Sequence, residues 1–436
     1  MTAHPFLNRV GQVELVARTG RVRKILATHV EADGPSSAIG DLCLVETRAS
    51  EPVLAQVAGV THDTVVLAPL EQGAQITPGA RVTAYTQAST VFVGEAFGGR
   101  AIDPMGRPID GGGVISGHEL GRLEGGSIGP MDRCSPRVPL ITGVRAIDGL
   151  LPLAQGQRVG VFAAAGVGKT CLMTQLAAQV QADRCVVCLV GERGREVEAF
   201  WRNIASADAR GRTTLVAATS DQTAAMRVRA VNYALALAEH WRSKGEQVLL
   251  LVDSMTRLAM ALREIGLAAG EPPTVRAYTP SVFAAIPRLV ERCGALRTGG
   301  SITAVMTVLS ETDDNDDPVA EVMKSLLDGH IILSRSLAER GHFPAIDVPK
   351  SISRLAPGIM TPEHGLAARK AAGLLSTYEA SRTLIETGLY AAGSNADIDM
   401  ALDRRPGLMA FLAQDRNERS AFEHTQMSLH QLMRIS

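Results

Sequence analysis

In the first part of the chain, apolar and polar residues alternate as they do in short β-strands. From about residue 20 to residue 86, β-rich runs alternate with glycine, proline and aspartate turns. Examples of these runs are Val53–Val57, Thr64–Leu67 and Arg81–Tyr85. Several short strands at such spacing predict a small β-barrel at the N-terminal end.

A glycine-crowded connecting region covers residues 98 to 130, and the pattern changes after it. Apolar runs of five or six residues then alternate with helical stretches, which is typical of a mostly parallel α/β sheet. We expect its strands at residues 158–163, 185–190, 213–218, 247–252, 301–309 and 330–334. From about residue 364 onward, segments rich in Ala, Leu and Glu predict helices and no strand.

These changes predict a three-part organisation. The predicted domains are a β-barrel at 1–86 for oligomerisation or docking, an α/β catalytic domain at 87–360 and a helical domain at 361–436. A length of 436 residues suits two or three domains with a sizeable core.

Composition and charge narrow the class of protein. The sequence is 46% hydrophobic and 20% charged, as in soluble globular proteins, and its formal charge of -1 offers no general attraction to nucleic acid. The six cysteines lack the second close pair that a four-ligand zinc site needs, which fits a reducing compartment. Without an apolar run of roughly 18 residues or a signal-peptide pattern, we expect a cytoplasmic protein.

The segment Gln157–Thr170 carries the most specific chemistry. An apolar strand runs into Gly166-Val-Gly-Lys-Thr170 and then into a helix rich in Leu, Met and Ala. Such a loop turns backbone N–H groups toward phosphates, while Lys169 reaches the outer phosphates and Thr170 can bind magnesium. A plain glycine turn between strand and helix would not require Lys and Thr at those two positions. The strict pattern has glycine where this chain has Ala163, yet the spacing holds from Gly166 onward.

Two carboxylates end apolar runs downstream of this loop. In an open parallel sheet, ligands bind beyond the carboxyl ends of the strands. Asp253, after Val248–Val252, is placed to hold magnesium through its water shell. Glu192 is placed to deprotonate a water molecule that attacks the bound phosphate. Each residue alone would more often be a helix N-cap, but the phosphate loop makes the functional interpretation the expected one.

Five separated segments together resemble the flagellar and type III secretion export ATPases, a family related to the catalytic subunits of rotary ATP synthases. The segments are Thr142–Leu150, Gly191–Glu196, Asp253–Arg257, Arg263–Pro273 and Leu327–Arg335. They occur in the family's order, and the resemblance runs from about residue 20 to about residue 400. It implies a homohexameric ring with a β-barrel, a RecA-like nucleotide-binding core and C-terminal helices.

The resemblance also implies ATP and Mg²⁺ as the ligands and assigns roles to individual residues. It makes Glu192 the catalytic base, Lys169 a catalytic phosphate contact, and Thr170 and Asp253 the magnesium ligands. It makes Arg354, in Ser351–Arg354, an arginine finger offered to the neighbouring subunit. The residues that it implies bind ATP are Ala164, Ala165, Gly166, Val167, Gly168, Lys169, Thr170, Cys171, Arg193 and, against the adenine ring, Phe343.

The partners implied by the resemblance are a central coiled-coil stalk protein, a peripheral stator or regulator, and chaperone–substrate complexes for export, at the inner face of the cytoplasmic membrane. Membrane association would be peripheral at most. The acidic stretch Asp313–Asp317 is by default a solvated turn before a helix at Pro318. We hypothesise that its acids face the ring axis and meet a basic stalk.

The sequence departs from the family pattern in its phosphate loop, and it is compatible with three alternative functions. Family members usually carry Gly-Ser where this loop has Ala164-Ala165, which matters if position 164 requires a positive φ. The alternatives are a catalytic subunit of a rotary ATP synthase, a hexameric nucleic-acid motor of the transcription-terminator type, and a nucleotide-holding structural subunit. Near-neutral charge and only two tryptophans argue against the motor, and Glu192 argues against the structural subunit.

Overall fold

The computed structural model describes most of the chain. The described residues are 17–49, 51–85, 89–116, 119–126, 128–205, 208–309 and 317–433. The chain separates into two compact units. The first contains residues 1–90, 221–228 and 260–282, and the second contains residues 91–220, 229–259 and 283–436.

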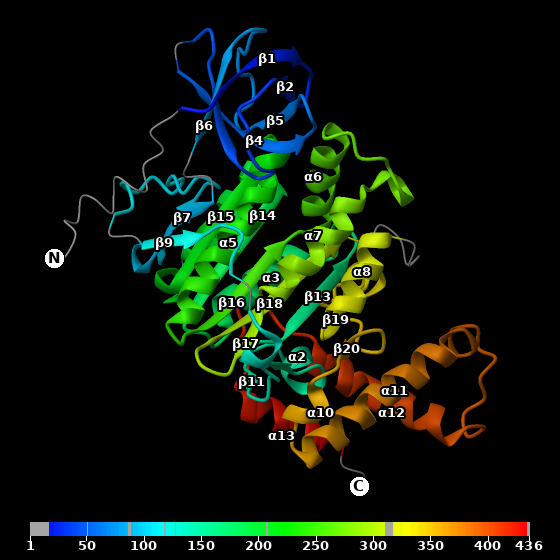
Figure 1. Cartoon of the computed structure of the whole chain (residues 1–436). Helices are drawn as coiled ribbons and strands as arrows, with labels where there is room; N and C mark the ends of the chain where they lie inside the picture. The colour runs from blue at the N-terminus through cyan, green and yellow to red at the C-terminus, as the bar shows by residue number, and fades with distance from the viewer. Residues whose placement is uncertain are drawn as a thin grey trace, which may run out of the picture. The chain divides into compact units, whose positions relative to one another are not determined.

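The first unit contains a closed barrel of six strands in the order β1-β2-β5-β4-β3-β6 (Figure 1, blue). Its strands are β1 Thr19–Ile25, β2 Val30–Ala32, β3 Leu42–Val45, β4 Val53–Val60, β5 Val65–Pro69 and β6 Arg81–Tyr85. Along β4 every second residue is buried, because successive side chains of a strand point to opposite faces. Closure leaves the sheet without a free edge, and the predicted barrel is confirmed.

The second unit is built on a parallel sheet whose main order is β20-β19-β13-β18-β16-β14-β15-β8. The strands are β8 Ala101–Ile102, β13 Arg158–Ala163, β14 Arg184–Glu192, β15 Thr213–Thr219, β16 Gln247–Asp253, β18 Ser301–Leu309, β19 Gly329–Leu333 and the antiparallel edge strand β20 Ile352–Ser353. The short strands β10 Arg133–Cys134 and β17 Gly294–Leu296 pair antiparallel beside β18. The strands β13 and β16 are almost wholly buried, as expected for a parallel sheet covered on both faces.

Helices follow the strands, as the sequence predicts. They are α2 Arg145–Leu150, α3 Lys169–Gln179, α4 Gly194–Ala205, α5 Ala224–Ser243, α6 Met255–Ala268, α7 Pro280–Glu291, α8 Pro318–Leu326 and α9 Arg335–Glu339. Two small antiparallel pairs complete the strands: β7 Thr90–Val93 with β9 Glu119–Arg122, and β11 Pro139–Leu140 with β12 Leu153–Ala154. Because β13, β14 and β16 are parallel neighbours or near neighbours, their carboxyl ends share one edge of the sheet.

The C-terminal part is helical (Figure 1, orange to red). It contains α10 Ala356–Ile359, α11 Pro362–Glu386, α12 Ala396–Leu412 and α13 Phe422–Met433. Asn395 caps α12 by accepting hydrogen bonds from the N–H groups of Asp397 and Ile398. Leu429 and Met433 of α13 join the apolar core of the sheet, so this amphipathic helix packs on its own unit. Among the described helices, none is both long and apolar enough to span a bilayer.

Candidate functional site

The phosphate loop joins β13 to α3 at the carboxyl edge of the sheet. Gly166 and Gly168 have φ angles of 81° and 93°, in the left-handed region that favours glycine. The described non-glycine residues with positive φ are Arg276 and Ala277, so neither Ala164 nor Ala165 carries that strain. The two alanines keep their N–H groups, so the departure from Gly-Ser removes no backbone donor from the loop and adds no positive-φ strain at these positions.

The first turn of α3 presents polar groups beside the loop. Lys169 begins the helix, and Thr170 and Cys171 follow with exposed side chains. The N-terminus of a helix attracts anions because its first N–H groups have no partner within the helix. A Cβ at position 168 would lie 3.3 Å from Cε1 of Phe343. Glycine at this position therefore lets the aromatic ring lie against the loop.

Lys169 meets two carboxylates that end neighbouring strands. Its Nζ lies 2.5 Å from Oδ1 of Asp253, at the end of β16, and 3.8 Å from Oε1 of Glu192, at the end of β14. Thr307 of β18, the strand between β13 and β16, donates a 2.7 Å hydrogen bond to Oδ1 of Asp253. The tertiary structure thus brings together the lysine and both acids that the sequence singles out.

Glu192 is buried, and its second oxygen faces a cation. Nη2 of Arg257, from α6, lies 3.3 Å from Oε2 of Glu192. Burial raises the pKa of Glu192 to about 7, helped by a hydrogen bond with Glu196 and by the charge of Asp253, and opposed by the charges of Arg257 and Lys169. A carboxyl with a pKa near neutrality is suited to accept a proton from water and later release it.

Arg354 lies at the opposite end of the sheet from the phosphate loop. Its N–H donates to the carbonyl of Asp328 at 3.0 Å, and the N–H of Asp328 donates to the carbonyl of Arg158 at 2.8 Å. Arg158 is the first residue of β13, whereas the loop follows its last residue, Ala163. Five residue steps in a strand span about 16 Å. The exposed Arg354 is therefore poorly placed to contact phosphates bound to its own chain.

Phe343 opens onto a cleft of about 540 Å³. Phe343 is 44% exposed, a large value for an aromatic residue. The other residues that line the cleft are Gly168, Cys171, Leu172, Gln175, Gly341, Pro344, Ala413, Gln414, Asp415 and Arg416. An aromatic face beside the phosphate loop is suited to stacking on a purine ring. Arg193, also expected to contact ATP, is exposed directly after Glu192.

Some groups of this site were not predicted from the sequence. Arg257 belongs to the segment Asp253–Arg257, one of those that carry the family resemblance, so its motif could have marked it as a candidate site residue. Thr307 is one of several polar residues in a buried strand, and no local pattern marks it. The loop between α12 and α13 that lines the cleft gave no signal either, since it lies about 245 residues beyond Lys169.

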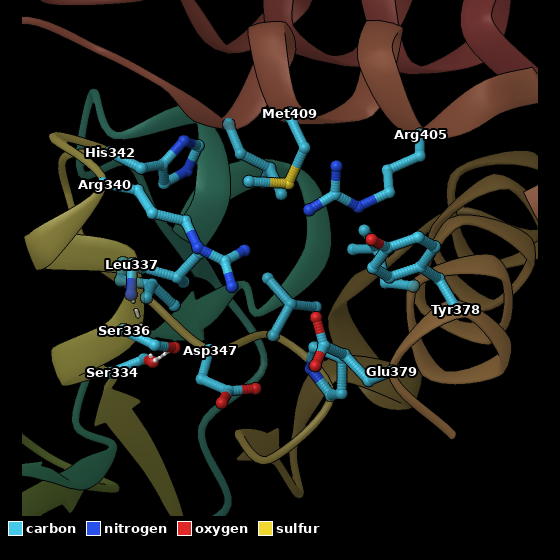
Figure 2. Close-up of a pocket in the computed structure, with 15 residues that line it drawn as sticks. Ser334, Ser336, Leu337, Arg340, His342, Asp347, Tyr378, Glu379, Arg405 and Met409 are labelled. Carbon is cyan, nitrogen blue, oxygen red and sulfur yellow. Dashed lines mark hydrogen bonds between the residues drawn. The ribbon is translucent and has the colours of Figure 1, made fainter. Parts of the chain in front are cut away.

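A second, smaller cavity of about 50 Å³ lies where the segment carrying Phe343 meets the C-terminal helices. Figure 2 shows the guanidinium groups of Arg340 and Arg405 directed into it. Arg405, on α12, also stacks over the ring of Tyr378, on α11, at 4.1 Å. The neighbouring residue of Phe343, His342, lines the same cavity. The C-terminal helices thus pack directly against the segment that forms one wall of the larger cleft.

Three family models match the chain. Residues 25–85 match the beta-barrel domain and residues 143–353 the nucleotide-binding domain of the ATP synthase alpha/beta family. Residues 360–431 match the C-terminal domain of the type III secretion ATPase EscN. The three matches follow the same order as the barrel, the parallel sheet and the terminal helices.

Individual proteins match over nearly the whole chain. The flagellum-specific ATP synthase of Bacillus subtilis is 43% identical, with 99% of each chain covered. The type 3 secretion system ATPase of Xanthomonas euvesicatoria is also 43% identical, over 94% of this chain and 92% of that protein. The structure of assembled EscN with its central stalk EscO, from enteropathogenic Escherichia coli, is 37% identical over 95% of this chain and 99% of that chain, with a TM-score of 0.85.

Proposed function

The chain belongs to the family of flagellum-specific and type III secretion ATPases, and from this membership we propose that it hydrolyses MgATP at sites shared between neighbouring subunits of a homohexamer. It is an ATPase with a nucleotide-binding α/β domain. The observation that supports a shared site is the position of Arg354. It lies near the start of β13, whereas the phosphate loop of the same chain follows the end of this strand.

Within one subunit, the phosphate loop and the first turn of α3 bind the nucleotide. The loop N–H groups, from Ala164 to Gly168, face the phosphates, and Lys169 contacts their outer oxygens. Phe343 stacks on the adenine ring, and Cys171 lines the same cleft. Arg193 adds a positive charge beside the phosphates.

Thr170 and Asp253 would hold Mg²⁺, with Asp253 acting partly through water. The oxygen donors of a hydroxyl and a carboxylate suit this ion, which keeps several waters and takes further oxygens from phosphates. Among the described residues, no group of three or more His, Cys, Asp or Glu side chains could form a metal cage. When bound, Mg²⁺ neutralises charge that develops on the phosphates.

Glu192 is the group we assign to the attacking water. Its carboxylate accepts the proton of the water, and the ion pair with Arg257 holds one of its oxygens in place. Arg354 of the adjacent subunit then stabilises the charge of the transition state, an effect worth roughly 10³ to 10⁵ in turnover. Because one chain carries the loop, the base and the finger, every interface of a homomeric ring is competent.

We propose export of proteins as the process that this turnover serves. The match of residues 360–431 to the C-terminal domain of EscN favours the export branch over a rotary synthase subunit. A central coiled-coil stalk, as EscO is for EscN, would occupy the ring axis. A stator or regulator would bind at the periphery, and chaperone-bound substrates would be released or unfolded at the cytoplasmic face of the membrane. Of the acidic stretch assigned to the stalk, residues 313–316 lie outside the described residues, and Asp317 caps α8.

The test is steady-state ATP hydrolysis as a function of protein concentration, with assembly followed by light scattering. We expect activity per subunit to rise with assembly, and to fall at least about 10³-fold in both Glu192→Gln and Arg354→Ala. Activity that is independent of concentration, or that survives the loss of Arg354, would rule out the shared site.

A further inference from the structure

The loop between α12 and α13 lines the nucleotide cleft together with Phe343. Four of its residues line the cleft: Ala413, Gln414, Asp415 and Arg416. The backbone N–H of Gln414 donates a 2.8 Å hydrogen bond to the carbonyl of Phe343. A direct backbone bond therefore holds this loop, which we call the base wall, against the segment that carries the aromatic ring.

The polar groups of the Gln414 side chain are all occupied by hydrogen bonds to the backbone. Its Nε2 donates to the carbonyls of Gly143 at 2.7 Å and Glu418 at 2.8 Å, and its Oε1 accepts from the N–H of Arg145 at 2.8 Å. A carboxamide has two N–H donors and one carbonyl acceptor, so each group has a partner. Gln414 is 6% exposed and has no donor left for a nucleobase.

Arg145, the first residue of α2, holds the same loop from the other side. Its Nε donates to the carbonyl of Phe411 at 2.8 Å, its Nη2 donates to the carbonyl of Ala413, and its Nη1 pairs with Glu418. Five donors in a planar fork allow one arginine to bind several acceptors at once. The side chain of Arg145 is 15% exposed, so these bonds are partly shielded from water.

The base wall is also bonded to the helix that begins with Lys169. Nε2 of Gln179, at the end of α3, donates to the carbonyls of Arg416 at 3.3 Å and Glu418 at 3.0 Å. The loop is thus joined to α2, to α3 and to the segment of Phe343. Each bond fixes its backbone, and no bond in this group requires a bound nucleotide.

We infer that Gln414 and Arg145 are positioning residues for the nucleobase: they hold the base wall in place beside Phe343, without touching the nucleotide. The inference rests on the proposed ATP site and extends it to the C-terminal helices. Because the wall is the link between α12 and α13, displacement of these helices changes base binding, while the phosphate loop keeps its own shape.

The test separates base binding from phosphate binding. Gln414→Leu keeps the approximate size of the side chain but removes its three hydrogen bonds. Arg145→Lys keeps the positive charge but removes the planar guanidinium that donates to several acceptors at once. The matched control is Gln426→Leu in α13, where Nε2 lies 3.1 Å from Nδ1 of His364 and the side chain does not line the cleft. KM for ATP, kcat, and inhibition by inorganic tripolyphosphate are measured for each full-length chain, together with thermal unfolding and assembly.

We expect Gln414→Leu and Arg145→Lys to raise KM for ATP about tenfold, with kcat and the inhibition constant of tripolyphosphate within about threefold of the parent. Gln426→Leu should leave all three constants near those of the parent. An unchanged KM for ATP in the two variants would overturn the inference, as would an equal rise in KM and in the tripolyphosphate constant. If one variant does not fold, the other decides. A parent chain with no ATPase activity would instead refute the proposed function.

Discussion

Lys169 and Asp253 form an ion pair at the carboxyl edge of the sheet, with Nζ 2.5 Å from Oδ1 and both side chains largely buried. Thr307 and Glu192 complete the surroundings of this pair. The ion pair must break before Lys169 can contact a phosphate and Asp253 can approach a metal ion. In the absence of these ligands, the pair keeps a positive and a negative group side by side in a largely buried position.

Removing only the lysine should destabilise the protein as well as inactivate it. Lys169→Met leaves the carboxylate of Asp253 buried without its cation, and we expect the free energy of unfolding to fall by about 3–5 kcal/mol. The double variant Lys169→Met, Asp253→Asn should recover most of this loss yet remain inactive. Chemical denaturation of the three chains provides the comparison, and a double variant no more stable than the single one would contradict the prediction.

The rate of hydrolysis should depend on pH through Glu192. The pKa of its carboxyl is raised from 4.5 to about 7, mainly by burial. Below about pH 7 the carboxyl of the free enzyme is protonated and cannot accept the proton of water, so kcat/KM, which reports the free enzyme, should rise with pH and level off above this value. Glu192→Gln should lose this rise together with the activity. A pH profile of the parent that is flat from about pH 5.5 to about pH 9 would speak against Glu192 as the base.

The same raised pKa has a consequence for stability, with a defined sign. Burial favours the neutral carboxyl in the folded chain. The contribution of neutral Glu192 to the free energy of unfolding is therefore fully present below about pH 4.5 and is lost as the pH rises through about 7. Thermal unfolding of the parent should therefore lose stability across this window relative to Glu192→Gln, which does not titrate. A difference between the two chains that does not vary with pH would contradict the shift.

Mixed rings should reveal whether the finger acts between subunits. Glu192→Gln and Arg354→Ala are each expected to be inactive alone. In rings assembled from equal amounts of both, about a quarter of the interfaces pair an intact Glu192 with an intact Arg354 of the neighbour, so about a quarter of the parent activity should return. A finger that acted within its own chain would give no recovery, because no subunit would then carry both residues.

Asp328 connects the finger segment to the phosphate-loop strand. Its carboxylate accepts hydrogen bonds from N, Nε and Nη2 of Arg158 at 3.0, 3.2 and 3.3 Å, while its carbonyl accepts from the N–H of Arg354. Asp328→Asn should lower the free energy of unfolding by about 1–3 kcal/mol and reduce kcat. Glu291→Gln is the matched control, because Glu291 meets the same arginine but is 52% exposed and should matter by less than about 1 kcal/mol. Equal effects in thermal unfolding would argue against a special role of Asp328.

Local pattern was sufficient to predict the elements and to single out three residues that the fold brings together, Lys169, Asp253 and Glu192. The glycines and Lys169 identify the phosphate loop because a phosphate cradle needs those residue types in consecutive positions. Asp253 and Glu192 could be placed beside it because the carboxyl ends of parallel strands meet at one edge, whatever the rest of the fold. The helix at Pro318 likewise begins where proline and its capping aspartate indicate.

The sequence by itself therefore determined the barrel, the parallel sheet, the terminal helices and the phosphate-binding chemistry, because strand alternation, helix periodicity and loop residues act over a few positions. Only the tertiary structure decided that Thr307 bonds Asp253, that Arg354 lies remote from the loop of its own chain, and that Gln414 lines the same cleft as Phe343. These relationships join residues tens to hundreds of positions apart. Their distances depend on strand order and on how the last helices pack, and no local pattern records either.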